Sequence, residues 1–201
     1  NLEFNFRTKT SSYHVPVKKK VEFPIRNLNP ELQIYTTPTK LIDINEDIRR
    51  KANELAKGED DLYVVVFKLA EWTNKNIEYN LSTVTSEASL SSSWVMKNGY
   101  GVCDEISNLF ISMARSLGIP ARPISGIAYT ESELFPEKWG AHEWTEVYFP
   151  EYGWVPFDPT YDQLGFVDAT HIKMTEGEKK NTVEYEWLGK NFDVKTSGIK
   201  T

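Results

Sequence analysis

Hydrophobic and polar residues alternate along much of the first 45 positions. Leu2, Phe4 and Phe6 follow a period of two, and so do the segments 13–17 and 21–25. Every second side chain of a β-strand lies on the same face, so this pattern predicts half-buried strands. The prolines at 16, 24, 30 and 38 lack a backbone donor, which restricts such strands to short lengths or to sheet edges. We therefore expect residues 1–45 to form a strand-rich arm.

After this segment the hydrophobic residues recur every three or four positions, which is the spacing of an amphipathic helix. Asn45 has the side chain of an N-cap, Gly58 can end the helix that follows, and the pair at 60–61 places negative charge at the start of a second helix. The predicted elements are a helix over 45–58, a helix over about 60–76, a short strand over 77–79, a polar loop over 82–93, and a short helix over 94–98 that Ser92 or Ser93 caps and Gly99 ends.

The clearest helical pattern begins after Gly101. Its apolar stripe is formed by Val102, Ile106, Leu109, Phe110, Met113, Ala114 and Leu117. Gly118, followed by Pro120, ends the helix. Cys103 is not part of the stripe, so we expect its side chain to point away from the core face.

Strands are predicted downstream of this helix, at 122–129, 141–149 and 154–158. The turn-rich segment 150–153 joins the last two into an antiparallel hairpin. A further hairpin is predicted from strands at 183–188 and 192–196. Helices followed by antiparallel strands indicate an α+β fold. We expect the arm at 1–45, a central core at 46–170, and C-terminal strands at 171–201 that belong to the same domain.

Composition and charge narrow the range of functions. The chain has 201 residues, 40% of them hydrophobic, and a net charge of −6, which is typical of a globular protein and argues against nucleic acid as a partner. No apolar run is long enough to span a membrane. Because the chain begins at Asn1 without a signal-like segment, we expect a processed chain or an excised fragment. Its location stays open, with an extracytoplasmic one favoured, and so does its oligomeric state.

The few cysteines and histidines exclude several kinds of site. Cys103 is the only cysteine, so an intrachain disulfide and a zinc site built on paired thiolates are both excluded. The histidines are scattered at 14, 142 and 171, and we expect no metal. His14 lies in the proline-rich arm and His171 in a polar tail, which makes both weak candidates for a catalytic base.

Cys103 is a candidate nucleophile because of its position at a helix start. The unpaired N–H groups there favour a thiolate and lower the pKa of a thiol. The neighbouring carboxylates of Asp104 and Glu105 oppose this effect, so an imidazolium would be needed nearby. A lone cysteine is also frequently a small buried hydrophobe, and position alone does not separate the two interpretations.

His142 and Asp158 are the candidate partners, since they lie on the two strands of the predicted hairpin. If residue 149 opposes 154, Asp158 falls on the opposite face from His142. If residue 149 opposes 153, His142 and Asp158 are diagonal neighbours on one face. Their backbones are then about 7–8 Å apart across the two strands, and their side chains can meet. A Cys–His–Asp triad therefore requires an odd loop or a bulge.

Three blocks of sequence, in this order, carry a resemblance to a known family. They are Gly101-Val102-Cys103-Asp104-Glu105 with the helix up to Arg122, then His142-Glu143-Trp144-Thr145-Glu146-Val147, then Gly153-Trp154-Val155-Pro156-Phe157-Asp158-Pro159-Thr160. Over residues 90–161, and more loosely over 46–80, the chain resembles the transglutaminase-like superfamily. The resemblance implies a papain-like fold in which the nucleophile at a helix start packs on an antiparallel sheet.

The resemblance also implies a chemistry. Cys103 would be the nucleophile, His142 the base and acid, and Asp158 the group that orients the imidazole, in thioester-forming amide hydrolysis or acyl transfer on a protein or peptide without a cofactor. Trp94 and Tyr100 are candidate oxyanion donors, and Trp139 is a candidate wall of the cleft. Protease-like hydrolysis is slightly favoured over transamidation or removal of glycans from asparagine. The alternative is a non-catalytic peptide- or polymer-binding module on the same fold.

Overall fold

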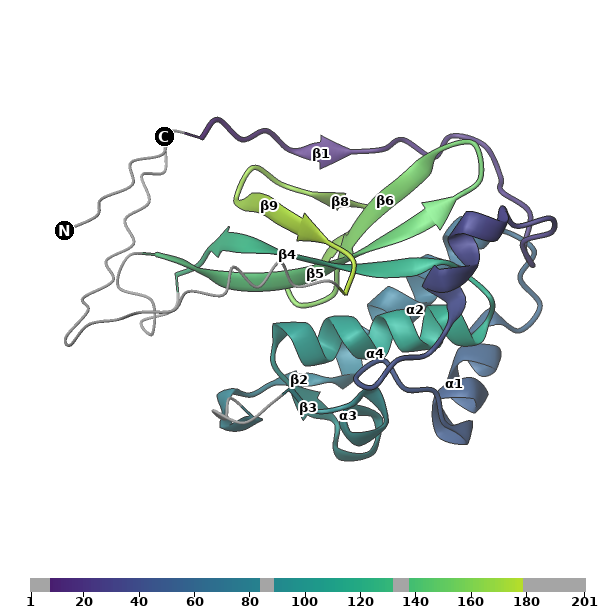
Figure 1. Ribbon diagram of the computed structural model, residues 1–201, viewed down its shortest axis with the longest axis horizontal. Helices are drawn as coiled ribbons and strands as arrows, with labels where there is room; N and C mark the ends of the chain where they lie inside the picture. The colour runs from purple at the N-terminus through teal and green to yellow at the C-terminus, as the bar shows by residue number, and fades with distance from the viewer. Residues whose placement is uncertain (1–7, 84–88, 132–137, 179–201) are drawn as a thin grey trace.

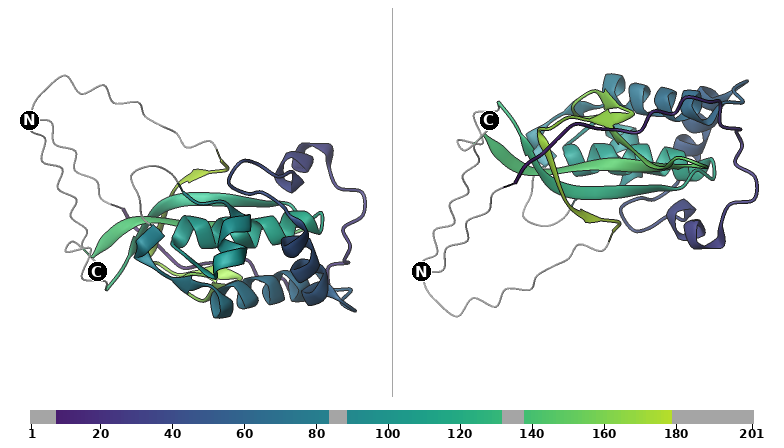
Figure 2. Two further views of the ribbon diagram at one scale, coloured as in Figure 1. Left: turned by 90° about the horizontal axis from the view of Figure 1, so that it is seen from below. Right: turned by 90° about the horizontal axis from the view of Figure 1, so that it is seen from above.

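The computed structural model describes residues 8–83, 89–131 and 138–178. Helices gather on one face of an antiparallel sheet, and the N-terminal segment crosses the other side (Figure 1). In the views from below and from above, the helices and the strands of the sheet overlap (Figure 2). This arrangement is the α+β fold with a helix packed on an antiparallel sheet that the sequence predicts.

The first two helices begin at capping residues. Helix α1 spans Glu46–Ala56, and the Asn45 side chain accepts the Ile48 N–H at 2.9 Å. Helix α2 spans Leu62–Asn76, and the carboxylate of Asp61 accepts the Tyr63 N–H at 2.9 Å. Both caps satisfy backbone donors that the first turn of a helix leaves unpaired, and both predicted helices are confirmed.

A short helix and a short parallel ladder lead to the third long helix. Helix α3 spans Ser92–Asn98 and ends at Gly99, whose φ of 77° suits a residue without a Cβ. The strand β2 (Glu78–Tyr79) pairs with β3 (Tyr100–Gly101). Helix α4 (Cys103–Ser116) follows at once, and Gly118 is again in the left-handed conformation. The chain therefore enters α4 from a fixed strand.

The main sheet of the described residues has five strands in the order β7-β6-β5-β4-β9. Their bounds are Gln163–Leu164 for β7, Gly153–Asp158 for β6, Trp139–Phe149 for β5, Ala121–Tyr129 for β4 and His171–Glu176 for β9. Two smaller strands, β1 (Tyr13–His14) and β8 (Phe166–Val167), pair with each other. All pairings in the main sheet are antiparallel.

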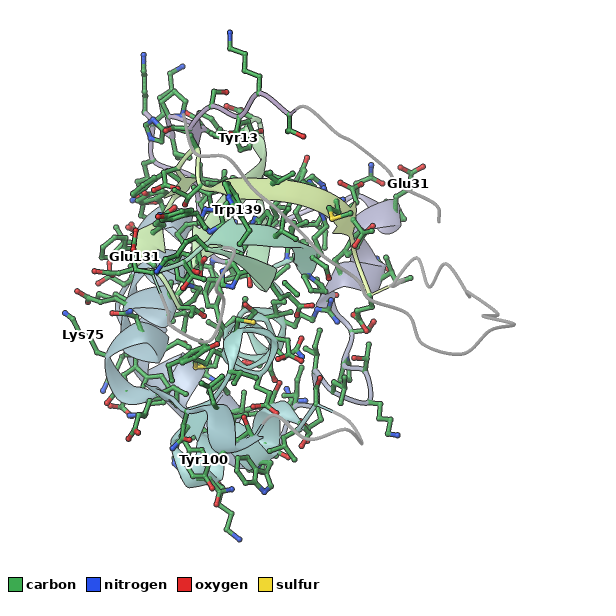
Figure 3. All side chains as sticks on the ribbon, turned by 90° about the vertical axis from the view of Figure 1, so that its left-hand side faces the viewer. Tyr13, Glu31, Lys75, Tyr100, Glu131 and Trp139 are labelled. Atoms are coloured by element: carbon green, nitrogen blue, oxygen red, sulfur yellow. The ribbon has the colours of Figure 1, made fainter. Side chains whose placement is uncertain are left out.

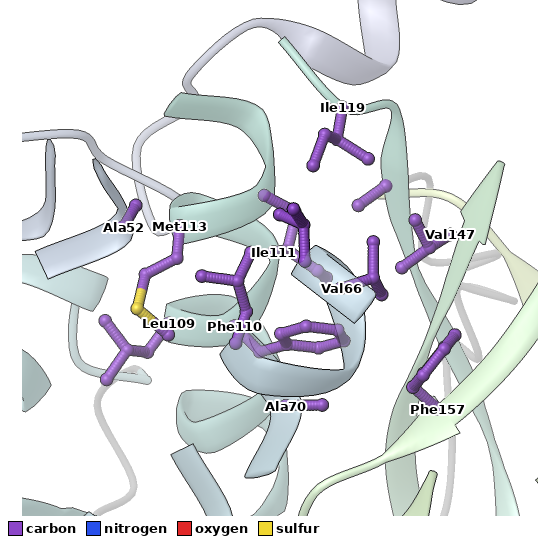
Figure 4. Close-up of a cluster of buried hydrophobic side chains, with 14 of the residues drawn as sticks. Ala52, Val66, Ala70, Leu109, Phe110, Ile111, Met113, Ile119, Val147 and Phe157 are labelled. Carbon is purple, nitrogen blue, oxygen red and sulfur yellow. The ribbon is translucent and has the colours of Figure 1, made fainter. Parts of the chain in front are cut away.

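The core lies between α4, its neighbouring helices and the sheet (Figure 4). Side chains from α4 such as Leu109 and Phe110 are fully buried, and so are Val147 and Phe157 on the strands opposite. The predicted apolar stripe of α4 is thus its core face. At about 25 cal/mol per Å² of apolar surface, this burial is the main term that holds α4 against the sheet.

The arm differs from its prediction. Within residues 8–45, paired strand is confined to β1 and to an isolated bridge between Glu22 and Asp61, and Pro30–Thr36 forms a 3₁₀ helix. The prediction of a strand-rich arm is wrong over this part. Its hydrophobic residues instead pack singly against the core, among them Val15, Val17, Phe23 and Ile25.

Residues 37–43 form a strap across the helical layer. The buried guanidinium of Arg115, near the end of α4, donates to the carbonyls of Thr37 at 2.7 Å and of Ala121 at 2.9 Å. Leu41 O accepts the Ser92 N–H at 2.9 Å, and an Asp43 carboxylate oxygen accepts the Ser93 N–H at 2.8 Å. The strap therefore connects the arm to both α3 and α4.

Two predictions concern segments at the limits of the structure. The hairpin expected at 183–188 and 192–196, like the alternation at 2–6, lies outside the described residues. Across the ranges that the structure does describe, no helix is both long enough and apolar enough to cross a membrane.

Candidate functional site

Cys103 occupies the first position of α4, and a neighbouring glutamate fixes the backbone there. The Glu105 carboxylate accepts the Val102 N–H at 3.0 Å and the Leu90 N–H at 2.9 Å. Glu105 is almost fully buried. Gly101 permits this arrangement, because a Cβ at that position would lie 3.0 Å from the Glu105 Cβ. The start of the helix is therefore held independently of Cys103.

The thiol of Cys103 faces the sheet at the residue next to His142. The Glu143 backbone forms a hydrogen bond with the sulfur, which favours the thiolate. Burial nevertheless raises the pKa of the Cys103 thiol to about 12, and the negative charge of Asp104 adds to this effect. The expectation that the helix start lowers the thiol pKa is wrong in its net direction, because desolvation outweighs the backbone N–H groups.

His142 and Asp158 are in direct contact. The Nε2 atom of His142 lies 2.6 Å from Oδ2 of Asp158, and both side chains are buried. The hairpin register explains the contact: Phe149 opposes Gly153 and Thr145 opposes Phe157, so the loop between them has three residues. A loop with an odd number of residues is the one for which the sequence analysis predicts that His142 and Asp158 meet.

Asp158 is ionised and fully occupied as an acceptor. Oδ1 accepts the backbone N–H groups of Thr160 at 2.9 Å and Tyr161 at 3.2 Å. Burial alone would raise the Asp158 pKa, but the hydrogen bonds from His142 and His171 outweigh it and set this pKa at about 2. An ionised carboxylate can only accept, so the Nε2–H of His142 donates and the other ring nitrogen, Nδ1, is left for a different partner.

The imidazole of His142 is held between aromatic rings. Tyr161 stacks on it with ring centroids 4.6 Å apart and an interplanar angle of 21°, and Trp144 lies nearly parallel at 6.1 Å. Trp144 is almost fully buried with Ile124 and Val167. Its role as a core residue, rather than a wall of the cleft, is therefore the one that the packing supports.

His171 is a part of this cluster that the sequence did not reveal. Its Nε2 atom lies 3.0 Å from the same Asp158 oxygen, and its side chain is only 1% exposed. The ring stands edge-on to His142, with centroids 5.5 Å apart. Strand β9 carries it, and β9 pairs with β4 rather than with a sequence neighbour. The expectation that His171 lies in a polar tail without an acidic partner is wrong.

The candidate oxyanion donors lie together, away from the sheet. Trp94 on α3 and Tyr100 on β3 contact each other edge-on, with centroids 5.2 Å apart. In Figure 3, Tyr100 lies among the helices at the lower edge, whereas Trp139 lies on the sheet. Trp139 stands edge-on to Tyr129 at 5.6 Å, and its buried indole N–H has no hydrogen-bond partner among the described residues.

Two tyrosines that the sequence did not single out lie near the thiol. The phenol groups of Tyr79 and Tyr161 both interact electrostatically with Cys103. Burial is the main cause that raises the Tyr79 pKa to about 12, so this phenol is neutral and keeps its O–H donor at neutral pH. Tyr79 is thus an additional candidate oxyanion donor. The sequence did predict the short strand that carries Tyr79. The structure pairs this strand with the one that leads to Cys103.

A pocket of about 280 Å³ opens beside the start of α4. Asp104, Asn108, Ser125 and Glu143 contribute to its lining, together with part of the strap. Trp94, Tyr100 and Trp139 do not line it. Its wall therefore combines acidic groups with apolar residues such as Leu41, Ile42 and Pro123, and neither Cys103 nor His142 is among its lining residues.

One group of side chains has the composition of a metal site. Ligand atoms of His142, Asp158 and His171 all lie within 4.8 Å of one another. The separations of 2.6 and 3.0 Å are hydrogen-bond lengths. Because the nitrogens already donate to the carboxylate, hydrogen bonding accounts for the whole arrangement without an ion.

Comparison with known proteins connects this geometry to a family. The model of the transglutaminase-like superfamily matches residues 49–159. The chain is 28% identical over 173 residues to the uncharacterized protein YebA of Bacillus subtilis, covering 78% of this chain and 24% of YebA. It is 28% identical over 125 residues to a protein-glutamine gamma-glutamyltransferase of Pseudomonas aeruginosa, covering 58% of this chain and 18% of that protein. The chain thus spans about a quarter or less of these curated relatives.

Solved structures show the same fold. A candidate cysteine protease from Cytophaga hutchinsonii superposes with a TM-score of 0.59 at 22% identity, over 80% of this chain and 53% of that one. The periplasmic domain of TgpA from Pseudomonas aeruginosa superposes with a TM-score of 0.52 at 25% identity, over 68% of this chain and 49% of that one. The family model covers more than half of the chain, including Cys103, His142 and Asp158, and the chain therefore belongs to the transglutaminase-like superfamily.

Proposed function

We propose that this protein is a cysteine-dependent enzyme that cleaves or transfers amide-linked acyl groups of protein or peptide substrates. Cys103 is the nucleophile, His142 the base and acid, and Asp158 the residue that orients the imidazole. The observation that carries the proposal is the buried 2.6 Å contact between His142 and Asp158, next to the residue whose backbone meets the Cys103 sulfur. With Nε2 of His142 committed to Asp158, Nδ1 is the nitrogen available to the thiol.

The reaction has two steps. The Cys103 sulfur attacks the substrate carbonyl while its proton passes to His142, which then protonates the departing amine and leaves a thioester. Water or a primary amine attacks this thioester, His142 takes the attacking group's proton, and the thiol is regenerated. Asp158 stabilises the positive ring in both steps. The Cys103 backbone N–H is the first oxyanion donor, and the Tyr79 phenol, which interacts electrostatically with Cys103, is the second.

The acceptor decides between hydrolysis and transamidation. We favour water, because bulk water competes with any amine unless the site excludes it. The family also contains a protein-glutamine gamma-glutamyltransferase, and in such an enzyme the acceptor is an amine.

A screen with glutamine-containing peptides, with and without a primary amine, tests the proposal. Mass spectrometry would follow chain cleavage and amine incorporation, and a coupled assay would follow ammonia release. We expect turnover with the native chain and none with Cys103→Ser, which differs by a single atom. Equal product from both chains, or none from the native chain across the screen, would contradict the proposal and favour a binding module.

A further inference from the structure

The carboxylate of Asp158 receives a second buried imidazole that the proposed reaction does not use. His171 Nε2 and His142 Nε2 lie 3.0 and 2.6 Å from the same oxygen, Oδ2. Asp158 is fully buried, and the His171 side chain is 1% exposed. A buried polar group of this kind is costly unless it is hydrogen-bonded, so its position in the middle of the site requires an explanation.

The other edge of the His171 ring is also anchored. Nδ1 lies 3.3 Å from Oδ1 of Asp168, and the same oxygen accepts the Thr170 N–H at 2.9 Å. Burial acts to raise the Asp168 pKa, but hydrogen bonds from Thr170 and His171 outweigh it, so this carboxyl is ionised. The His171 ring is therefore contacted at both nitrogens, since the Thr170 hydroxyl also lies 3.3 Å from Nδ1. Asp168, His171, Asp158 and His142 lie in one continuous row of alternating carboxylate and imidazole groups.

Strand β9, which carries His171, passes close to the backbone of β4 at Gly126. Gly126 on β4 pairs with both His142 and Lys173. A Cβ at Gly126 would lie 2.1 Å from the Ile172 carbonyl oxygen and 2.9 Å from the Trp144 ring. Only glycine fits at this point. The Ile172 carbonyl and the Trp144 ring thus occupy the place of a side chain at Gly126, and His171 lies on β9 opposite Ala128, next to this point.

We propose that His171 is a positioning residue for the reaction: its Nε2–H holds the Asp158 carboxylate in the orientation that fixes the His142 imidazole. The inference rests on the proposed function of Cys103 and His142. Without His171, Oδ2 keeps a single donor, and the carboxylate can turn away from His142. The backbone donors to Oδ1 hold only the other oxygen.

Substitutions that differ in reach separate this role from simple packing. His171→Gln keeps an N–H donor near the place of Nε2, and His171→Asn carries its N–H near the place of Nδ1, too short to reach Asp158. His171→Leu removes the donor and keeps apolar bulk. His14→Leu is the matched control, since His14 lies on β1 and is exposed. Thermal unfolding would verify that each variant is folded.

Two measurements are made on the 201-residue chain and its variants. Spectra of protein labelled with ¹⁵N-histidine report the N–H that His142 donates to Asp158, and only three histidines contribute signals. The rate of Cys103 alkylation by iodoacetamide at neutral pH reports the thiol. We expect His171→Leu and His171→Asn to lose the fixed His142 N–H signal and to slow alkylation by about tenfold or more. His171→Gln should restore both.

The two readouts also separate this inference from the proposed function. Retention of the His142 signal in His171→Leu or His171→Asn would overturn the positioning role, and so would a His171→Gln chain as impaired as His171→Asn. If His171→Leu does not fold, the Gln and Asn pair still decides. A native chain without enhanced alkylation would contradict the proposed function, whereas the ¹⁵N spectra would still test the contact through Asp158.

Discussion

The two parts of the candidate site, one on the sheet and one at the start of α4, are ordered to different degrees. On the sheet, His142, Asp158 and His171 are joined by hydrogen bonds and surrounded by aromatic rings. At the start of α4 the backbone is equally well held by Glu105, but the thiol itself is disfavoured as a thiolate, with a pKa of about 12. The comparison teaches that the proposed base, His142, is held in place in advance, whereas the proposed nucleophile, Cys103, needs a base to become reactive.

The largest expected effect comes from breaking this dependence with His142→Ala. Burial disfavours the Cys103 thiolate, so in the proposed mechanism the thiol reacts by passing its proton to His142. Because His142→Ala removes this base, alkylation by iodoacetamide at pH 7 should fall by about a hundredfold or more. His14→Ala is the control. Equal rates in the native and His142→Ala chains would mean that the two halves are not coupled.

A smaller effect is expected from the helical half. Glu105→Ala removes the buried acceptor of the Val102 and Leu90 N–H groups, and we expect it to lower the free energy of unfolding by about 2 kcal/mol or more. Glu71→Ala is a matched change within α2, where Glu71 meets Lys75 on the surface at 2.6 Å. It should cost about 0.5 kcal/mol or less. Urea denaturation of both variants measures the difference, and similar losses would contradict the structural role of Glu105.

The smallest expected effect is a dependence of stability on acidity. The Asp158 pKa is about 2 in the folded chain, below the ordinary value of 3.8 for an aspartate. A lowered pKa contributes stability that is present above about pH 3.8 and is lost as the pH falls towards 2. One such group gives a slope of at most about 1.4 kcal/mol per pH unit. Urea denaturation between pH 5 and 2 should show this part of the slope in the native chain. Its persistence in Asp158→Asn would assign it to other carboxyl groups.

The elements built on local signals were predictable from the sequence. The caps at Asn45 and Gly99 and the stripe of α4 depend on residues within one or two turns. The sequence named His142 and Asp158 as candidate partners but left two hairpin registers open. The structure has the register with three loop residues, which places both side chains on one face because a strand alternates its faces.

Features that depend on distant packing were not predictable. His171 contacts Asp158 only because β9 pairs with the edge of β4 that faces away from β5. No short sequence pattern predicts that strand pairing. The pKa of Cys103 depends on burial by segments remote in sequence. In the arm, residues such as Phe23 alternate like a strand yet fill places on the helical core one at a time. Alternation reports a buried face and does not say what covers it.

The strap at residues 37–43 limits how far the chain can be shortened from its N-terminal side. A chain that began at residue 46 would keep every residue of the candidate triad. It would also remove the Thr37 carbonyl from the enclosed guanidinium of Arg115, and the Leu41 carbonyl and the Asp43 carboxylate from the serines at the start of α3. The shortest chain expected to keep this packing therefore begins at or before Thr37, well ahead of the three sequence blocks that carry the family resemblance.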